Sequence, residues 1–190
     1  MTYVKDLNHQ ESTGKKEGIA IFAKNIINSG PIFYSGKEVN IHKLFHENID
    51  NENLKKNKAF VWVNVKDKDD NHYKFVTTHF TITKNGESTP YQLEVLDLLL
   101  AQLEKLGEFV FCGDMNAPRG NETFNRLAEK YKDNIPLEYK TSIDQNLHRV
   151  KGLQVMVDGL FTTPTYRTSN VKLVDGISDH MAVVAEINKN

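Results

Sequence analysis

The stretch Glu108-Phe-Val-Phe-Cys-Gly-Asp-Met-Asn116 guides the interpretation of the whole sequence. Its first part, 108–112, is a short apolar run bounded by glycines, which predicts a buried strand. The strand is followed by a small glycine and then by a carboxylate, Asp114, and an amide, Asn116. At the carboxyl-terminal edge of a strand, we expect both polar groups to reach solvent-accessible space.

A helix is predicted directly before this strand. Thr89 is a suitable N-cap, Pro90 suits the first helical position, and Gln92 completes a capping box. Gly107 is expected to end the helix. The leucines that recur at helical spacing are Leu93, Leu96, Leu100 and Leu103.

Strands and helices alternate along the rest of the chain. Further strands are predicted at 18–22, 59–65, 73–78, 153–161, 171–174 and 181–187, and a second helix at 122–131. Several neighbouring strands look hairpin-linked, which favours a layered α/β fold with mixed or antiparallel sheets. The polar segment 51–58 is predicted to be a loop within a single domain, 1–190, because a cut there would leave an N-terminal piece too small for its own core.

The composition narrows the class of protein. The chain has 190 residues and a formal net charge of −1, which excludes a strongly basic, sequence-independent nucleic-acid coat. Cys112 is the single cysteine, so an intramolecular disulfide and a cysteine-based zinc cluster are excluded. The N-terminus lacks the apolar core of a signal peptide, and no apolar run is long enough to span a bilayer. We therefore expect a soluble, cytoplasmic protein.

Titratable side chains gather at the ends of the predicted strands. Ser178-Asp-His180 precedes the last strand, His79 ends another, and Asp158 lies inside an apolar run. If the strand at 108–112 and the last strand are antiparallel neighbours, the polar groups that follow the first and precede the second share one edge of a sheet. Considered alone, Asp114 is most simply interpreted as a turn residue, and each histidine as a solvated side chain. Asp158 is different, since a carboxylate in an apolar strand needs a specific partner.

This inventory of side chains suits phosphoester hydrolysis. Carboxylate oxygens are the ligands that Mg²⁺ prefers, and the bound ion neutralises charge on a phosphoryl oxygen. A histidine can accept a proton from the attacking water. A carboxylate on the other ring nitrogen then fixes the tautomer and stabilises the imidazolium.

The same motifs resemble those of a known superfamily. Gly113-Asp-Met-Asn116 and Ser178-Asp-His180 resemble the two C-terminal signatures of the endonuclease/exonuclease/phosphatase superfamily, which has the deoxyribonuclease I-like fold. Thr78-His79 is similar to its central histidine motif, and Val157-Asp-Gly-Leu-Phe161 to the motif that carries the partner of the catalytic histidine. Gly18-Ile-Ala-Ile-Phe22 resembles the strand that precedes them. The resemblance covers residues 18–187 and implies an α/β fold of packed, mostly antiparallel sheets flanked by helices.

The resemblance also implies a role for each motif residue. It makes His180 the general base, with Asp158 orienting and polarising the ring. Asp114 would position the nucleophile and Asn116 would contact the phosphate. The other implied roles are metal ligation (Asp179 and Asp114, holding Mg²⁺ or Mn²⁺) and phosphate binding or assistance to the leaving group (His79).

One element of the family pattern is displaced. The family carries a metal-binding glutamate, usually in a Gln-Glu pair, on a strand before the 18–22 region. Here Gln10-Glu11 lies in a polar run, and we interpret Glu11 as a solvated loop residue. The chain then resembles an N-terminally shortened member with an exposed sheet edge through which it can self-associate.

Two functional hypotheses follow from the sequence. The leading one is a Mg²⁺-dependent phosphoester hydrolase, and specifically a phosphodiesterase. The other is a non-catalytic or partner-completed family member that only binds a phosphorylated ligand or a protein. The near-zero net charge slightly favours a small phosphoester over long nucleic acid, and no amphipathic helix indicates a membrane surface. Arg119, Arg149 and Arg167 are either phosphate contacts or surface charges.

Overall fold

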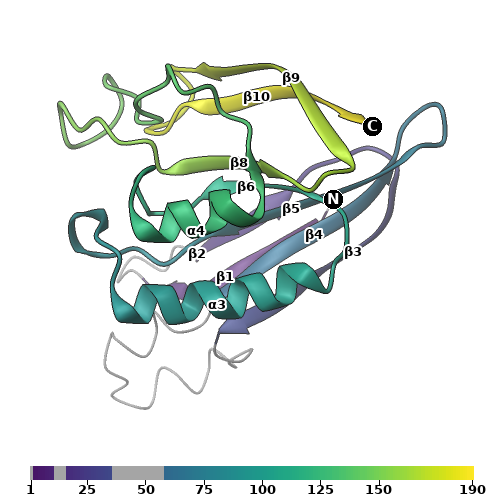
Figure 1. Cartoon of the computed structure of the whole chain (residues 1–190), viewed down its shortest axis with the longest axis horizontal. Helices are drawn as coiled ribbons and strands as arrows, with labels where there is room; N and C mark the ends of the chain where they lie inside the picture. The colour runs from purple at the N-terminus through teal and green to yellow at the C-terminus, as the bar shows by residue number, and fades with distance from the viewer. Residues whose placement is uncertain (1, 11–15, 36–57) are drawn as a thin grey trace. The chain divides into compact units, whose positions relative to one another are not determined.

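A computed structural model describes the backbone of residues 2–10, 16–35 and 58–190, and the side chains of 18–35 and 58–190. The chain divides into two compact units (Figure 1). The first unit consists of residues 1–81 and 94–107, and the second of 82–93 and 108–190. Each unit is built around strands that pair in antiparallel fashion.

The first unit contains a sheet in the order β3 (Ile26–Ser35), β4 (Lys58–Lys66), β5 (His72–His79). The pair β1 (Thr2–Gln10) and β2 (Lys16–Ile21) lies beside this sheet. The predicted hairpin is confirmed as β4 and β5, which pair from Phe60 and Thr78 to the turn. Phe60 and Val61 are adjacent in sequence and both fully buried, so β4 is covered on both faces.

Helix α3 (Pro90–Glu104) begins at the predicted cap. The backbone N–H of Gln92 donates to the hydroxyl of Thr89 at 3.1 Å, which satisfies one of the free amides of the first turn. After the helix, Gly107 has a φ of +74°, a conformation that favours glycine. Residues 94–104 of the helix belong to the first unit, and their buried side chains are Val95, Leu96, Leu99, Leu100 and Leu103.

The second unit contains an antiparallel sheet, a hairpin and a helix. The sheet order is β6 (Val110–Asp114), β8 (Asp158–Thr162), β7 (Lys132–Asp133), and the hairpin is β9 (Tyr166–Val174) with β10 (Ala182–Lys189). Helix α4 (Glu122–Lys130) buries Phe124 and Leu127. The Phe161 ring of β8 lies 5.4 Å from the Phe124 ring and 6.0 Å from that of Phe111, between centroids. These aromatic rings hold β6, β8 and α4 together.

The predicted α/β class is confirmed, while some element boundaries are wrong. The strand predicted at 153–161 begins only at Asp158. The residues before Asp158 form hydrogen bonds with loops and not with a neighbouring strand. The carbonyl of Val155 accepts from the amide of Ser142, and the carbonyl of Val157 accepts from the amide of Met115. Strand β3 was not predicted because Asn28-Ser-Gly-Pro31 lies in its middle, a composition tolerated at the edge of a sheet. Strands β1 and β7 were not predicted either.

Candidate active site

The pairing of β6 with β8 sets Asp114 directly opposite Asp158. Cross-strand partners project from the same face of an antiparallel sheet, and opposed like charges destabilise it unless a positive charge lies close by. Both residues are half-buried. Gly159 follows Asp158, and a Cβ added there would lie 2.3 Å from the buried Phe161 ring. A glycine is therefore required next to Asp158 for the ring to keep its place.

The turn after β6 is tied down by backbone hydrogen bonds. The amide of Met115 donates to the carbonyl of Val157 at 2.8 Å, and the amide of Asn116 donates to Oδ1 of Asp114 at 2.7 Å. Asn116 has a φ of +48°, which asparagine tolerates better than most residues. The half-buried Asn116 is thus held beside Asp114 by the local turn.

His180 forms a short polar contact with Asp158. Its Nδ1 lies 2.7 Å from Oδ2 of Asp158, and the two side chains are 28% and 15% exposed. The hydrogen bond to Asp158 raises the pKa of His180 to about 9 against the opposing effect of burial, with further support from the charges of Asp158, Asp114 and Asp179. His180 is therefore an imidazolium at neutral pH in the metal-free protein, and it supplies the positive charge that the two carboxylates need.

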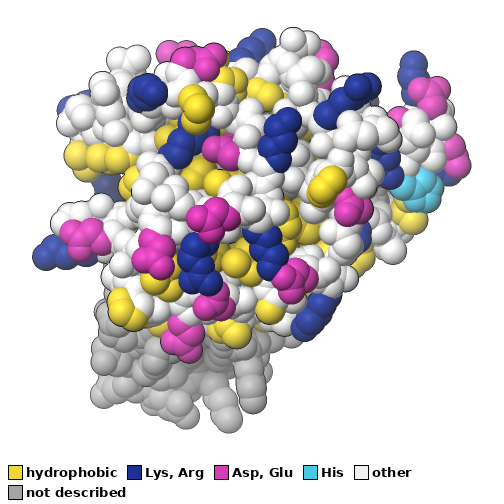
Figure 2. Space-filling model, in the orientation of Figure 1, with side chains coloured by type: hydrophobic (Ala, Val, Ile, Leu, Met, Phe, Trp, Pro, Cys, Tyr) yellow, Lys and Arg dark blue, Asp and Glu magenta, His cyan; other side chains and the backbone are white. Residues whose placement is uncertain are grey.

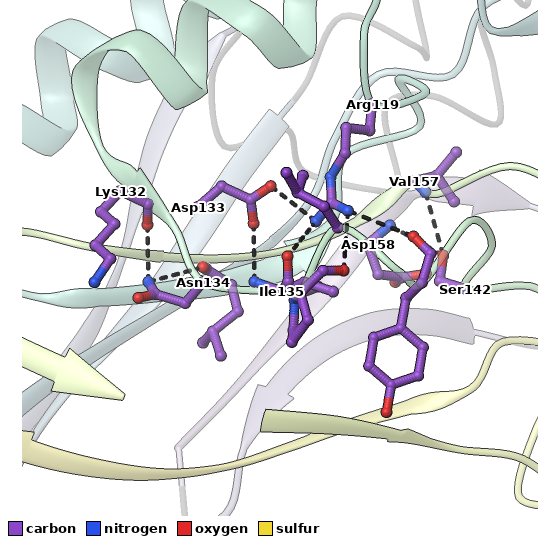
Figure 3. A network of polar contacts seen from close by, with 12 residues as sticks. Arg119, Lys132, Asp133, Asn134, Ile135, Ser142, Val157 and Asp158 are labelled. Carbon is purple, nitrogen blue, oxygen red and sulfur yellow. Dashed lines mark hydrogen bonds and ion pairs between the residues drawn. The ribbon is translucent and has the colours of Figure 1, made fainter. Parts of the chain in front are cut away.

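The strand neighbour assumed for this geometry was wrong. The last strand, β10, pairs with β9 and not with β6. An antiparallel bridge between Ile143 and His180, together with the Met181 amide donating to the Ser142 carbonyl at 2.7 Å, attaches the histidine to the segment before β8. Ser142 is buried, and its hydroxyl accepts from the amides of Val157 and Asp158 at 3.2 Å each (Figure 3). One serine therefore links both members of the His–Asp pair.

Asp144 is a second residue that the sequence analysis overlooked. Its fully buried carboxylate accepts from the amides of Asn146 at 2.8 Å, Leu147 at 3.0 Å and Gly176 at 2.6 Å. These bonds, that of Gly176 foremost, lower the pKa of Asp144. A single ionised carboxylate thus ties the turn at 144–147 to the loop that leads into Ser178-Asp-His180. The sequence around Asp144 did not indicate this role, because an aspartate in a polar stretch is ordinarily a turn residue.

The other predicted residues have varied positions. Asp179 is exposed, accepts from the Ser178 hydroxyl at 2.9 Å, and has a lowered pKa mainly because of that bond. His79 belongs to the first unit, where it ends β5 with its side chain exposed. Glu11 lies outside the described residues. His148, which the sequence analysis did not consider, has its ring centroid 6.3 Å from that of His180.

Arg119 is neither a phosphate contact nor a free surface charge. Its guanidinium pairs with Asp133 at 2.8 Å and donates to the carbonyl of Ile135 at 2.9 Å (Figure 3). The two charged side chains are 17% and 14% exposed. The Arg119 side chain therefore holds the segment after β7 in place.

The residues near His180 suit a hard divalent cation. Ligand atoms of Asp114, Asp158 and His180 all lie within 4.8 Å of one another. Carboxylate oxygens are the ligands that Mg²⁺ and Mn²⁺ prefer, and this group offers two carboxylates. One oxygen of each carboxylate already accepts a hydrogen bond, Oδ2 of Asp158 from His180 and Oδ1 of Asp114 from the Asn116 amide.

The His180–Asp158 pair predicts a pH dependence of stability. The pKa of His180 is about 9 in the folded state and about 6.5 in the unfolded chain, so the stabilisation is complete below pH ~6.5 and is lost as the pH rises to ~9. We expect the free energy of unfolding to fall by roughly 2 kcal/mol across this window. Urea unfolding in EDTA at both ends of the window measures it. The variant His180→Gln is the control and should show little change there; an equal decrease in this variant would refute the assignment.

On the face of the molecule seen in Figure 2, charged side chains of both signs are interspersed. This distribution agrees with the net charge of −1. Among the described residues, no helix has both the length and the apolar character needed to cross a lipid bilayer.

Comparisons with known proteins give a match at the level of structure only. No model of a protein family matches the sequence, and no curated protein matches it significantly. The solved structures that it resembles include the catalytic domain of human Nocturnin with a bound sulfate anion (14% identity, TM-score 0.68), covering 100% of this chain and 72% of that one.

Two bacterial structures give similar matches. One is a mannosyl-6-phosphatase of Bacteroides thetaiotaomicron (14% identity, TM-score 0.62), and the match covers 98% of this chain and 76% of the phosphatase chain. The other is an endonuclease/exonuclease/phosphatase family protein of Leptotrichia buccalis (13% identity, TM-score 0.67), and the match covers 98% of this chain and 70% of that protein's chain. At these identities the match concerns the fold. The chain therefore has the deoxyribonuclease I-like fold of the endonuclease/exonuclease/phosphatase superfamily.

Proposed function

We propose that the chain is a divalent-metal-dependent phosphoester hydrolase, and specifically a phosphodiesterase, in which His180 activates water. The observation that carries the proposal is the 2.7 Å bond between His180 and Asp158, with Asp114 directly opposite Asp158 on the neighbouring strand. The fold adds support, since one structural neighbour is named a phosphatase and another holds sulfate, a tetrahedral oxyanion like phosphate. The matches to Nocturnin and to the two bacterial proteins cover both units, which favours a single domain over 1–190.

The side chains divide the work by their chemistry. Nδ1–H of His180 donates to Asp158, which leaves Nε2 as the atom that accepts the proton of the attacking water. By the family resemblance, Asp114 is assigned to align that water and, with Asp179, to hold the cation, and Asn116 is assigned to contact the phosphate. His79 is assigned to phosphate binding by the family resemblance. The cation, Mg²⁺ or alternatively Mn²⁺, supplies neutralisation of the charge that develops on the phosphoryl oxygens.

The high pKa of His180 has a consequence for this role. An imidazolium cannot accept a proton, so His180 must lose its proton before it acts as a base. The carboxylates that raise its pKa include Asp114, and a cation held there offsets their negative field. We therefore expect the pKa of His180 to be lower in the metal-bound protein than in the metal-free protein, which an NMR titration with and without Mg²⁺ measures.

Removal of the metal tests the proposal directly. We expect the full chain to hydrolyse bis(p-nitrophenyl) phosphate with Mg²⁺ and to lose this activity in EDTA, because the cation would neutralise the charge that develops on the phosphoryl oxygens. Restoring an excess of Mg²⁺ should restore the rate. Equal rates with Mg²⁺ and EDTA would refute metal dependence. No hydrolysis under either condition, combined with binding of inorganic phosphate, would favour the alternative of a binding-only protein.

The sequence and surface favour a small substrate. The near-zero net charge, together with the interspersed charges on the face seen in Figure 2, favours a small phosphoester over long nucleic acid. We propose that the substrate is a small phosphodiester and that the protein acts in the cytoplasm. We also propose self-association at a sheet edge, which size-exclusion chromatography at several protein concentrations tests.

A further inference from the structure

A second group of metal-ligating side chains shares His180 with the candidate active site. A ring nitrogen of His148, a carboxylate oxygen of Asp179 and a ring nitrogen of His180 all lie within 4.8 Å of one another. The histidine rings are tilted by 59° and their centroids are 6.3 Å apart. Both histidines are half-buried and Asp179 is exposed, so an ion can reach the group from solvent. This group has two imidazoles where the Asp114–Asp158 group has two carboxylates.

In each histidine, Nδ1 is engaged in a hydrogen bond within the protein. A ligating histidine commonly donates its other ring N–H to a carboxylate or to a backbone carbonyl. Nδ1 of His180 is bonded to Oδ2 of Asp158 at 2.7 Å in this way. Nδ1 of His148 accepts from the amide of Val150 at 3.1 Å and lies 3.2 Å from the carbonyl oxygen of the same residue. The remaining ring nitrogen of each histidine, Nε2, is the one left for a ligand.

The loops that carry these side chains share one anchor. The buried Asp144 carboxylate accepts from the amides of Leu147 and Gly176, which precede His148 and Asp179 respectively. The backbone of Asp144 adds two bonds, donating to the carbonyl of Asp179 at 3.0 Å and accepting from the amide of His148 at 2.9 Å. The backbone segments that carry the three ligands are therefore held together by the fold.

We propose that His148, Asp179 and His180 bind a borderline transition-metal ion, of which Zn²⁺ is the type, and that this ion inhibits the enzyme. Two imidazoles and one carboxylate, with water in the fourth position, form a common tetrahedral zinc set. Imidazole suits Zn²⁺, whereas Mg²⁺ prefers oxygen ligands, so the two ions should not compete equally for this group. An ion on Nε2 of His180 removes the atom that accepts the proton of water. The inhibitory part of the proposal rests on the proposed function, and the binding part does not.

Binding is measured first, on the full chain freed of metal. We expect equilibrium dialysis to show saturable binding of one Zn²⁺ that persists in excess Mg²⁺. Mutation of a residue that only hydrogen-bonds to a metal ligand weakens metal binding by on the order of 10- to 100-fold. His148 is a proposed ligand itself, so His148→Gln should weaken Zn²⁺ binding at least that much. His72→Gln is the matched control, because His72 is an exposed histidine of β5. If the His148 variant melts at a lower temperature, Asp179→Asn serves as the second test on an exposed residue.

Inhibition is measured second. Zn²⁺ should inhibit Mg²⁺-supported hydrolysis by the wild type and by His72→Gln, and should inhibit His148→Gln only at correspondingly higher concentration. Equal Zn²⁺ affinity in the wild type, His148→Gln and Asp179→Asn, or no saturable binding in the wild type, would overturn the proposal. If the chain hydrolyses nothing, the proposed function fails while the dialysis result still decides whether the Zn²⁺ site exists. Binding without any inhibition would overturn the inhibitory part alone.

Discussion

Replacement of His180 by alanine should lower Mg²⁺-dependent phosphodiester hydrolysis by roughly two to four orders of magnitude, the usual contribution of a general base. The fall should appear in kcat, because the ring acts on the attacking water and not on the ground-state substrate. Asp158→Asn should cause a loss of the same order, since an amide in place of the carboxylate no longer fixes the tautomer through the 2.7 Å bond. Steady-state kinetics with bis(p-nitrophenyl) phosphate measures both effects.

The controls separate this expectation from a loss of folding. His72→Ala removes an exposed histidine and should retain wild-type kcat. The double variant His180→Ala/Asp158→Asn should be little worse than either single variant, because the two side chains act as a unit. A His180→Ala protein that melts normally and keeps most of the wild-type rate would rule out the base assignment.

Replacement of Arg119 by methionine should destabilise the protein by about 3 kcal/mol, the size expected when one partner of a largely buried ion pair is removed. The change leaves Asp133 only 14% exposed and without its guanidinium, and it also removes the bond to the Ile135 carbonyl. Arg119 further lies 5.7 Å from the centre of the Phe124 ring, so packing on α4 is lost as well. Urea denaturation followed by fluorescence or circular dichroism gives the free energy of unfolding.

A double-mutant cycle sharpens this test. Asp133→Leu together with Arg119→Met removes both charges and should be less destabilised than the sum of the single variants. The exposed Arg167 provides the matched control, and Arg167→Ala should change the free energy of unfolding by no more than about 0.5 kcal/mol. Equal destabilisation by the Arg119 and Arg167 variants would show that the ion pair has no particular importance for the fold.

Local patterns in the sequence were sufficient for much of the secondary structure. The capping box at Thr89 and the leucine spacing predicted α3, and the alternation of β-forming residues with a polar turn predicted the hairpin of β4 and β5. These signals depend on residues close together in the chain. Strand β3 shows the limit of such patterns, because its Asn28-Ser-Gly-Pro31 segment is extended only through pairing with β4.

The supporting residues of the candidate site illustrate the same limit. Ser142, Asp144 and His148 lie in a stretch without periodic apolar residues, so nothing local distinguishes them. Their roles come from hydrogen bonds to distant parts of the chain, such as that between Asp144 and Gly176, which are 32 positions apart. The same holds for Arg119, which the sequence suggested to be either a phosphate contact or a surface charge. In the structure it forms an ion pair with Asp133.

The sequence by itself determined the class of fold and the residues worth attention, because an apolar strand that ends in glycine, aspartate and asparagine is a local chemical pattern. It also placed Asp158 in an apolar setting where a partner was required. The family resemblance implied His180 as that partner. Only the tertiary structure shows the 2.7 Å bond between these two residues, which are 22 positions apart, and that His148 lies near the same ring. The physical reason is that a hydrogen bond needs two groups within about 3 Å, and only the folded chain brings distant side chains that close.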